Sequence, residues 1–367
     1  SDVVPESVDT LGNVSFINNQ FVLNYLHDAS TLIKIYKTSG KFIRDVKLPG
    51  IGSAGGFGGK RSYTEAFYSY SSFNAPPTIY RYDMKTGKST LFRQAKVKFD
   101  SSLYEVKQVF YNSKDGTRVP MFLTYKKGLQ RDGTNPTLLY GYGGFNIPQT
   151  PGFSVGRVAW LEMGGIYAVA CIRGGSEYGK DWWKGGSRLN KQNTFDDFAW
   201  AGKWLIDNNY TSTPKLAMQG GSNGGLLVGA VLNQHPDLFG AAIPQVGVMD
   251  MLRFDKFTIG WAWTSDYGYA KNPADFKAMY AYSPYHQAKP GTKYPPTLVT
   301  TADHDDRVFP AHSFKYTAAM QHAQAGDAPV LIRIQVRGGH GAGLPTALAI
   351  EQQADMYAFL VKSLGMN

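Results

Sequence analysis

The stretch MQGGSNGGLLVGAVL, residues 218–232, places one serine between glycines with apolar residues on either side. Gly220, Ser222 and Gly224 form the pattern G-x-S-x-G, preceded by the strand-like KLAM and followed by the helical GGLLVGAVL. In this setting a sharp turn between strand and helix exposes the serine hydroxyl as a nucleophile. A solvated serine in a flexible glycine-rich loop is the alternative. The strand–turn–helix setting favours Ser222 as a nucleophile.

Outward from this stretch, apolar strand-like segments alternate with helical ones. The strand-like segments include PTLLYGYGG, GGIYAVACIRGG, AAIPQVGV, PPTLVTTAD and VLIRIQVRGGH, and the helical ones include NTFDDFAWAGKWLIDNN. Nearly continuous apolar strands in such an alternation are typical of a parallel sheet that helices cover on both faces. We expect a doubly wound, mostly parallel α/β-hydrolase domain over residues 97–367, opened by a hairpin that turns at Asp115 and Gly116. We expect Asn193 or Thr194 to cap the helix in NTFDDFAW.

A serine nucleophile needs a base, and the base needs an acid to orient it. In α/β-hydrolases the acid and then the histidine follow the serine along the chain, on loops after later strands. TLVTTA leads into DHDDRV with its acids at positions 303, 305 and 306, and VLIRIQV leads into RGGHGAG with His340. We expect His340 to be the base. The residues alone leave the acid open among Asp303, Asp305 and Asp306.

Acyl transfer also needs donors for the oxyanion that develops in the transition state. The backbone N–H of Asn223, which follows the nucleophile, is expected to be one donor. After the strand PTLLYG the sequence reads YGGF, where many esterases have a histidine-rich and glycine-rich loop. The Tyr142 hydroxyl is therefore a candidate second donor. Simple packing of Tyr142 is the alternative, since the chain has 23 tyrosines.

The first hundred residues have a different sequence pattern, which predicts short strands separated by turn residues. IYKTSGKFIRDV and YDMKTGKSTLFR place Gly40 and Gly87 at equivalent turns, each followed by lysine. This offset falls within the period of about 40 to 50 residues typical of β-propeller blades. We expect residues 1–96 to be the last blades of an incomplete propeller whose N-terminal part is missing, since two blades cannot close a ring. A small independent β-domain with similar hairpins is the alternative.

Composition excludes several classes of protein. The 367 residues carry a net charge of +10, but Lys and Arg form no basic run, so we expect no nucleic-acid partner. Neither a membrane-spanning stretch nor a signal peptide is visible, so we expect no membrane association and a cytoplasmic or periplasmic location. The single cysteine, Cys171, is expected to be buried and structural. We expect no metal and no cofactor, since GGFGGK lacks the strand–helix setting of a phosphate loop.

Several motifs together resemble the prolyl oligopeptidase family of serine peptidases, which cleave after proline. They are YGYGGFN, RGGSEYGKDWWKGG, NTFDDF, GGSNGGLLVG, PDLFGAAIPQVGVMDMLRFDKFTIGWAWTSDYG, TADHDDRV and GGHGAG. The resemblance is dense over residues 100–367 and looser over the first hundred, which resemble the last blades of that family's propeller. It implies Ser222 as nucleophile, Asp305 as acid and His340 as base, with the Asn223 N–H and the Tyr142 hydroxyl as oxyanion donors.

The resemblance also implies how substrate is held. A proline ring would stack on Trp263, because an aromatic face recognises a rigid apolar ring without polar partners. Arg307 would bond a substrate carbonyl one residue earlier. An ion pair for Arg307 and a core position for Trp263 are the alternatives. The rest of the apolar S1 pocket, which holds the residue before the scissile bond, would be formed by Phe145, Val248, Tyr267 and Val308.

The leading hypothesis is a serine peptidase that cleaves short peptides on the carboxyl side of proline through an acyl-enzyme. An acylaminoacyl- or dipeptidyl-peptidase would need a device that binds the substrate's N-terminus. A lipase or esterase of the same fold fits GWAWTSDYG and Arg307 less well, and a non-catalytic binding protein would not need three triad candidates. The expected partners are short proline-containing peptides and the missing N-terminal propeller segment, on which activity would depend.

Overall fold

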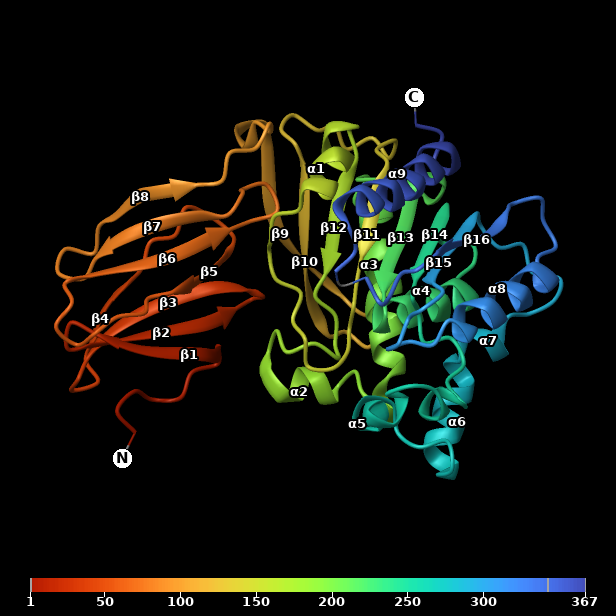
Figure 1. The fold of residues 1–367 in the computed structure, drawn as a ribbon, viewed down its shortest axis with the longest axis horizontal. Helices are drawn as coiled ribbons and strands as arrows, with labels where there is room; N and C mark the ends of the chain where they lie inside the picture. Colours follow the sequence, from red (N-terminus) through yellow and green to blue (C-terminus); the bar gives the residue numbers. More distant parts are fainter. Residues whose placement is uncertain (1, 342, 367) are drawn as a thin grey trace.

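The computed structural model describes residues 2–341 and 343–366, and its two parts lie next to each other along the long axis (Figure 1). The first part consists of two four-stranded antiparallel sheets, each with its strands in sequence order. The strands are β1 (Thr10–Ile17), β2 (Gln20–His27), β3 (Ser30–Lys37) and β4 (Phe42–Asp45), then β5 (Ser53–Gly56), β6 (Glu65–Ser71), β7 (Thr78–Asp83) and β8 (Ser89–Gln94).

The two sheets have the same order of strands and a glycine in the same turn, as expected of propeller blades. Gly40 lies in the turn between β3 and β4, and Gly87 lies in the corresponding turn between β7 and β8. Their φ angles of +79° and +77° are nearly equal and belong to the left-handed region that favours glycine. The two sheets share one apolar core, in which the rings of Phe57 and Tyr68 stack with centroids 5.0 Å apart. The matched turns predicted from the sequence are therefore confirmed.

The second part is built on an eight-stranded sheet with the order β16-β15-β14-β13-β11-β12-β10-β9. The hairpin of β9 and β10 is antiparallel and turns at Asp115 and Gly116, as predicted, and β10 also pairs antiparallel with β12. All other neighbours in this sheet are parallel. The strands are β9 (Tyr104–Asn112), β10 (Arg118–Lys126), β11 (Thr137–Tyr140), β12 (Ile166–Ala170), β13 (Leu216–Gly221), β14 (Ala241–Gln245), β15 (Thr297–Ala302) and β16 (Val330–Gln335).

Helices cover both faces of this sheet and enclose two apolar clusters. One cluster packs α1 and α9 against one face, and the other packs α3, α4 and α8 against the opposite face. The doubly wound α/β-hydrolase architecture predicted from the sequence is confirmed. The helices are α1 (Val155–Glu162), α2 (Gly179–Lys184), α3 (Gln192–Asp207), α4 (Asn223–Gln234), α5 (Thr264–Tyr267), α6 (Pro273–Tyr282), α7 (Pro284–Gln287), α8 (Ala311–Ala323) and α9 (Thr346–Ser363).

The predicted cap of α3 is wrong. The helix begins at Gln192, so Asn193 and Thr194 lie inside its first turn. The chain enters α3 from the short 3₁₀ helix η2 (Arg188–Asn190) with Lys191 already helical, so no side chain caps the start. The Thr194 hydroxyl instead donates to the backbone carbonyl of Arg173 at 2.9 Å. Thr194 therefore fastens the loop after β12 to the start of α3.

Side-chain contacts join the two parts. The Tyr178 hydroxyl, just before α2, donates to the carboxylate of Asp28 in the turn between β2 and β3 at 2.5 Å. Asn74 donates to the backbone carbonyl of Tyr104 at 3.1 Å. Phe73 is buried in the same apolar cluster as α1 and α9. The first part therefore packs on the edge of the large sheet that β9 and β10 form (Figure 1).

None of the described helices combines the length and the apolar character that crossing a membrane requires.

Candidate active site

Ser222 lies at the turn from β13 into α4 with strained backbone angles, φ +60° and ψ −115°. Non-glycine residues rarely adopt such angles, and the surroundings must hold them in place. The Ser222 N–H donates to the carbonyl of Gln245 at 2.9 Å, which ties the turn to β14. A Cβ at Gly220 would lie 2.3 Å from the carbonyl oxygen of Gly224, so only glycine fits there. The sequence pattern thus has a steric reason, and the turn is the sharp one that the pattern predicts.

Asp305 and His340 are hydrogen-bonded to each other. His340 Nδ1 lies 2.7 Å from Asp305 Oδ2, across the loops that follow β15 and β16. The backbone N–H groups of Arg307 and Val308 donate to Asp305 Oδ1 at 3.0 and 2.9 Å. Asp305 is buried, so these donors stabilise a carboxylate that water does not reach. The bond at Nδ1 fixes the histidine ring and leaves Nε2 as the nitrogen that can exchange a proton.

The other two acids of the same loop do not reach His340. Asp303 bonds the neighbouring His304 ring at 2.7 Å and accepts from the N–H of Gly338 at 3.3 Å. The His304 side chain lowers the pKa of the Asp303 carboxyl. Asp306 is exposed. The structure thus brings only one of the three candidate acids to the histidine.

No hydrogen bond joins the Ser222 hydroxyl to His340, or to any other group, within the part of the chain that the structure describes. Such bonds are often long in unliganded sites and shorten when substrate binds. A cavity of about 400 Å³ opens beside the serine turn and is lined by Gly221, Gln245, His340 and Met356 among others. Its wall includes Gly339, Gly341 and Gly343, and Gly341 has a φ angle of +102°, which lies in the region that favours glycine.

The backbone of Tyr142 lies beside Asn223 at the start of α4, so the two residues predicted to supply oxyanion donors are neighbours. The N–H of Asn223 is one of the first N–H groups of that helix, which have no partner within the helix. The Asn223 side chain donates to the backbone carbonyl of Tyr142 at 2.5 Å, and so fixes the loop after β11 beside the serine. Burial raises the pKa of the Tyr142 hydroxyl to about 12. The hydroxyl therefore keeps its proton near neutral pH and can donate it in a hydrogen bond.

The five apolar residues predicted for the S1 pocket all lie in or against one cluster. The ring of Tyr267 meets that of Phe145 edge to face, with centroids 5.5 Å apart and planes at 84°. Trp263 stacks on Phe254 at 6.5 Å and 12°, and remains partly exposed. Phe254 was missed in the sequence because it lies nine residues before Trp263 in a separate 3₁₀ turn. Val248 and Val308 are buried in the same cluster.

Arg307 is exposed, and its guanidinium forms no ion pair among the described residues. Its backbone is fixed, because its N–H bonds Asp305 and its carbonyl accepts from the Thr258 hydroxyl at 2.6 Å. The guanidinium is near enough to Tyr142 to lower the pKa of that hydroxyl, against the larger effect of burial. The alternative, an ion pair between Arg307 and Asp305, is therefore absent from the described residues.

Sequence reasoning missed a buried ion pair beneath the site. Lys191 Nζ lies 3.1 Å from Asp266 Oδ2, and both side chains are buried. Burial lowers the pKa of the Lys191 ammonium, while the charge of Asp266 acts in the opposite direction. The only sequence signal is that Asp266 stands between Trp263 and Tyr267, an acid inside a predicted apolar pocket.

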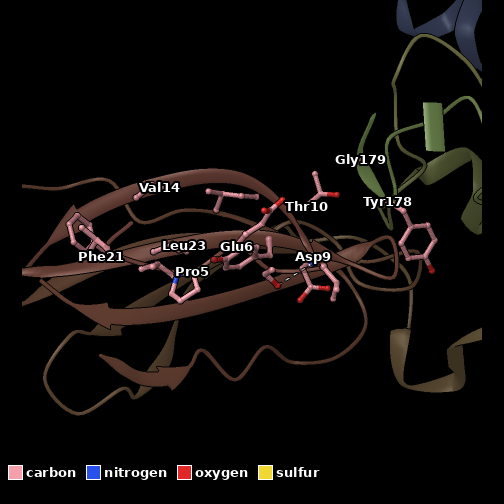
Figure 2. A pocket seen from close by; sticks show the side chains of 15 residues that line it. Pro5, Glu6, Asp9, Thr10, Val14, Phe21, Leu23, Tyr178 and Gly179 are labelled. Atoms are coloured by element: carbon pink, nitrogen blue, oxygen red, sulfur yellow. Dashed lines mark hydrogen bonds between the residues drawn. The ribbon is translucent and has the colours of Figure 1, made fainter. Parts of the chain in front are cut away.

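A second cavity, of about 560 Å³, lies away from these residues, where the N-terminal segment crosses β1 and β2 (Figure 2). Pro5, Val14 and Phe21 line it, and Tyr178 stands at the border with the second part. It is the larger of the two cavities, but none of the predicted site residues lines it. This larger cavity, between one crossing segment and a sheet face, therefore carries no part of the candidate site. Of the predicted site residues, His340 lines the smaller cavity.

Metal and thiol chemistry find no support among the residues that the structure describes. No group of three or more His, Cys, Asp or Glu side chains within residues 2–341 and 343–366 is arranged to hold a metal ion. Cys171 is buried, and burial raises the pKa of its thiol well above the ordinary value. A thiol in this state is a poor nucleophile.

Comparison with known proteins identifies relatives of both parts. The profile of the prolyl oligopeptidase family matches residues 151–367, and that of the N-terminal β-propeller domain of prolyl oligopeptidase matches residues 1–95. A prolyl endopeptidase from Elizabethkingia miricola is 49% identical over all of this chain and 52% of its own length. One from Dictyostelium discoideum is 44% identical, over all of this chain and 49% of its own length.

Solved structures agree with this assignment. One of two prolyl endopeptidases studied for the role of inter-domain dynamics in catalysis and specificity superposes with a TM-score of 0.94 at 45% identity, over 100% of this chain and 54% of its own. Prolyl oligopeptidase B from Galerina marginata, bound to a 35mer hydrolysis and macrocyclization substrate, gives 0.94 at 39% identity, over 100% of this chain and 53% of its own. The chain thus spans about half the length of the relatives that it matches. It belongs to the prolyl oligopeptidase family.

Proposed function

We propose that this chain carries the catalytic machinery of a serine peptidase that cleaves short peptides on the carboxyl side of proline. The observation that carries the proposal is the strained Ser222 turn beside the Asp305–His340 couple. Ser222 Oγ would attack the carbonyl of the scissile bond while His340 Nε2 accepts its proton. His340 would then protonate the leaving amine, which leaves an acyl-enzyme for water to hydrolyse by the same route in reverse order.

Asp305 would hold the imidazole in the tautomer with its proton on Nδ1 and stabilise the imidazolium that forms. The buried position and the two backbone donors to its other oxygen support this role, because they hold the carboxyl group in one orientation. The oxyanion would be held by the Asn223 N–H and the Tyr142 hydroxyl. The start of α4 holds the Asn223 N–H in place, and the Asn223 side chain holds the backbone of Tyr142. Donors that are in place before substrate arrives stabilise a transition state strongly.

The residue before the scissile bond would lie among Phe145, Val248, Trp263, Tyr267 and Val308. A partly exposed indole backed by the Phe254 ring offers a flat apolar face for a proline ring. The Tyr267 hydroxyl is occupied by its bond to Asn223, and the rings and aliphatic side chains of the pocket suit proline, which has no N–H to satisfy. The free guanidinium of Arg307 would donate to a substrate carbonyl one residue earlier.

We also propose that residues 1–96 are blades of a larger propeller and that residues 97–367 form the catalytic domain. The gap between β8, which ends at Gln94, and β9, which begins at Tyr104, supports a boundary there. Val8 is 96% exposed near the first blade, and Leu91 and Phe92 are each 61% exposed on the second. Apolar side chains on both outer sheets, in a chain that spans half of its relatives' length, support further blades as the partner.

The test is hydrolysis of a blocked Gly-Pro 4-nitroanilide beside its Gly-Ala analogue, with the complete natural polypeptide that carries residues 1–367. Release of 4-nitroaniline from the proline substrate, much faster than from the alanine one, is expected. Preference for the unblocked dipeptide would indicate a dipeptidyl-peptidase, and preference for an acetylated amino acid would indicate an acylaminoacyl-peptidase. Activity confined to a nitrophenyl ester would indicate an esterase. Each of these three outcomes contradicts the proposal.

A further inference from the structure

The buried ion pair of Lys191 and Asp266 lies directly beneath the candidate active site. Lys191 precedes α3, and Asp266 lies in α5, 75 residues later in the chain. Their side chains are 1% and 0% exposed, and Nζ lies 3.1 Å from Oδ2. Removing two charges from water is costly, and their attraction repays that cost only when further hydrogen bonds satisfy both groups. The partners of those further bonds indicate what the pair holds.

Most of these bonds go to one loop. Lys191 Nζ donates to the backbone carbonyl of Gly143 at 2.8 Å. Asp266 Oδ1 accepts from the backbone N–H of Phe145 at 2.9 Å and from the indole N–H of Trp183 at 2.7 Å. The cation and the anion therefore hold the segment 143–145 at both of its ends, immediately after Tyr142.

This loop has a backbone that needs such support. Gly143, Phe145 and Asn146 have φ angles of +64°, +57° and +57°. Two of the three are not glycine, and left-handed residues of this kind persist only where their surroundings hold them. A Cβ at Gly143 would lie 2.3 Å from the Thr194 methyl carbon, so the loop also has little room to relax. Loss of the ion pair would release a strained segment next to the oxyanion donor.

A second chain of hydrogen bonds connects the ion pair to Tyr142. Tyr267, the residue after Asp266, donates from its hydroxyl to Asn223 Oδ1 at 2.8 Å. The Asn223 side chain in turn donates to the carbonyl of Tyr142 at 2.5 Å. Tyr142 is thus held through its own carbonyl by Asn223 and through the following residues by the ion pair.

We infer that Lys191 and Asp266 are positioning residues that fix the Tyr142 hydroxyl where the oxyanion of the transition state forms. The inference rests on the proposed function. Neither residue reaches substrate, because both side chains are fully enclosed. They act on the transition state through the loop, so their loss lowers kcat more than it raises KM.

The primary test is Asp266→Asn, with Asp275→Asn as the matched control. Asp275 is also buried, bonds the cation Arg188 at 3.2 Å and accepts from the backbone N–H of Tyr269 at 3.0 Å. Arg188 and Lys191 lie three residues apart at the entry to α3, so the two pairs join the same regions. Only the Asp266 pair touches the Tyr142 loop. We expect Asp266→Asn to lower kcat for the Gly-Pro substrate by about 10- to 100-fold, below the loss for a complete oxyanion donor.

The control separates positioning from stability. Thermal unfolding is measured for both variants, and kcat is measured well below either midpoint. Asp275→Asn is expected to lose stability while it keeps kcat within about twofold, because its bonds do not reach the loop. Equal loss of kcat in the two variants, or an unchanged kcat in Asp266→Asn, would overturn the inference. If Asp266→Asn does not fold, the double variant Lys191→Met/Asp266→Asn, which buries no unpaired charge, replaces it with the same expected loss.

A double-mutant cycle with Tyr142→Phe tests the route. If the pair acts through the Tyr142 hydroxyl, Asp266→Asn adds little to the loss once that hydroxyl is gone. The same factor in both backgrounds would overturn the inference. Failure of the proposed function is recognised separately, because the unsubstituted enzyme would then not hydrolyse the proline substrate and the inference would fail with it. An active enzyme in which Asp266→Asn has no effect would contradict the positioning role alone.

Discussion

The two parts of the molecule differ in what they bury. Within the described residues, the two blades bury only Ser72 and Thr78 among polar side chains, and their core consists of aliphatic and aromatic groups. The second part buries ionisable side chains throughout, namely Arg173, Glu177, Lys191, Asp197, Asp250, Asp266, Asp275, Asp305 and His312. Buried charge is costly and concentrates where a protein needs fixed electrostatics. Buried ionisable groups therefore concentrate in the second part, which also contains the proposed active site.

The largest effect is expected from the serine turn. Ser222→Ala should lower kcat by roughly 10⁵-fold or more, leaving what binding and the oxyanion donors supply. The free energy of unfolding should change little, because the substitution removes one partly exposed oxygen and keeps the backbone. Steady-state kinetics and urea unfolding check both parts of this prediction. Near-normal turnover would remove Ser222 from the chemistry.

Substitutions in the loop 303–306 should distinguish the effect of Asp305 on kcat from the effects of the two neighbouring acids. Asp305→Asn should lower kcat by roughly 10⁴-fold, because the amide favours the wrong histidine tautomer. Asp303→Asn and Asp306→Asn serve as controls from the same loop and should be mild, since neither side chain contacts His340. Parallel kcat measurements decide the matter, and a severe loss at position 306 with a mild one at 305 would reverse the assignment.

Glu177 should give the second part a pH-dependent stability. Burial raises the pKa of its carboxyl above the ordinary 4.5 to about 8, and Oε2 has no hydrogen-bond partner within the described residues. The folded state therefore holds a proton that the unfolded state has lost between about pH 4.5 and 8. Its contribution to stability is complete below about pH 4.5 and is lost as the pH rises toward 8, by at most about 1.4 kcal/mol per pH unit.

Glu177→Gln should remove that dependence. The variant should gain stability over the parent by a few kcal/mol at pH 8, on the order set by the same linkage, and little at pH 5. Urea unfolding of both proteins at pH 5, 6.5 and 8 measures the difference, in which the other titrating groups cancel. Parallel pH profiles would show that Glu177 is ionised in the folded protein.

A substitution of Trp263 tests whether this residue lines the S1 pocket or belongs to the apolar core. Trp263→Ala should reduce kcat/KM about fivefold more for the Gly-Pro than for the Gly-Ala substrate, because the lost aromatic contact is worth about 1 kcal/mol beyond its buried area. Competition between the two substrates in one reaction gives this ratio directly. Equal losses would assign Trp263 to the core with Phe254.

The smallest effect on stability is expected in the blades. Leu91→Lys should change the free energy of unfolding of the 367-residue chain by less than about 0.5 kcal/mol, since Leu91 lies 61% exposed on β8. Leu227→Ala, in the fully buried face of α4, should cost about 2–5 kcal/mol. Leu91→Lys should nevertheless reduce self-association in analytical ultracentrifugation, because β8 is a sheet edge. Unchanged association would show that this face needs no neighbour.

Local patterns predicted most of the fold, because each element carries its own signal. The serine turn is encoded in Gly220 and Gly224, where a Cβ would clash with the backbone, and the repeated blade turns are encoded in Gly40 and Gly87. The start of α3 was missed because Asn193 and Thr194 bond the preceding loop instead of capping the helix. Among the acids of DHDDRV, only side-chain direction separates 303, 305 and 306. From residue types alone that direction was not accessible, although the family resemblance implied the one that contacts His340.

The Lys191–Asp266 pair was beyond sequence reasoning for a different reason. The two residues are 75 positions apart, with Lys191 at the start of one helix and Asp266 inside another, short helix. The two side chains come together only when α3 and α5 pack beneath the loop after β11. The position of the His340 ring relative to Ser222 likewise depends on the packing of the loop after β16, which residue types alone do not determine.

The central claim is that Ser222 forms the covalent intermediate with a proline-selective pocket beside it. Cleavage after Lys215 and Arg253 yields the peptide 216–253, in which Ser222 is the only hydroxyl side chain. The enzyme is treated with a peptidyl phosphonate ester bearing a proline analogue, and the digest is read by mass spectrometry. We predict one adduct, on this peptide, formed faster than with the alanine analogue and absent in Ser222→Ala. An adduct on another peptide, or equal labelling of Ser222→Ala, would contradict the account.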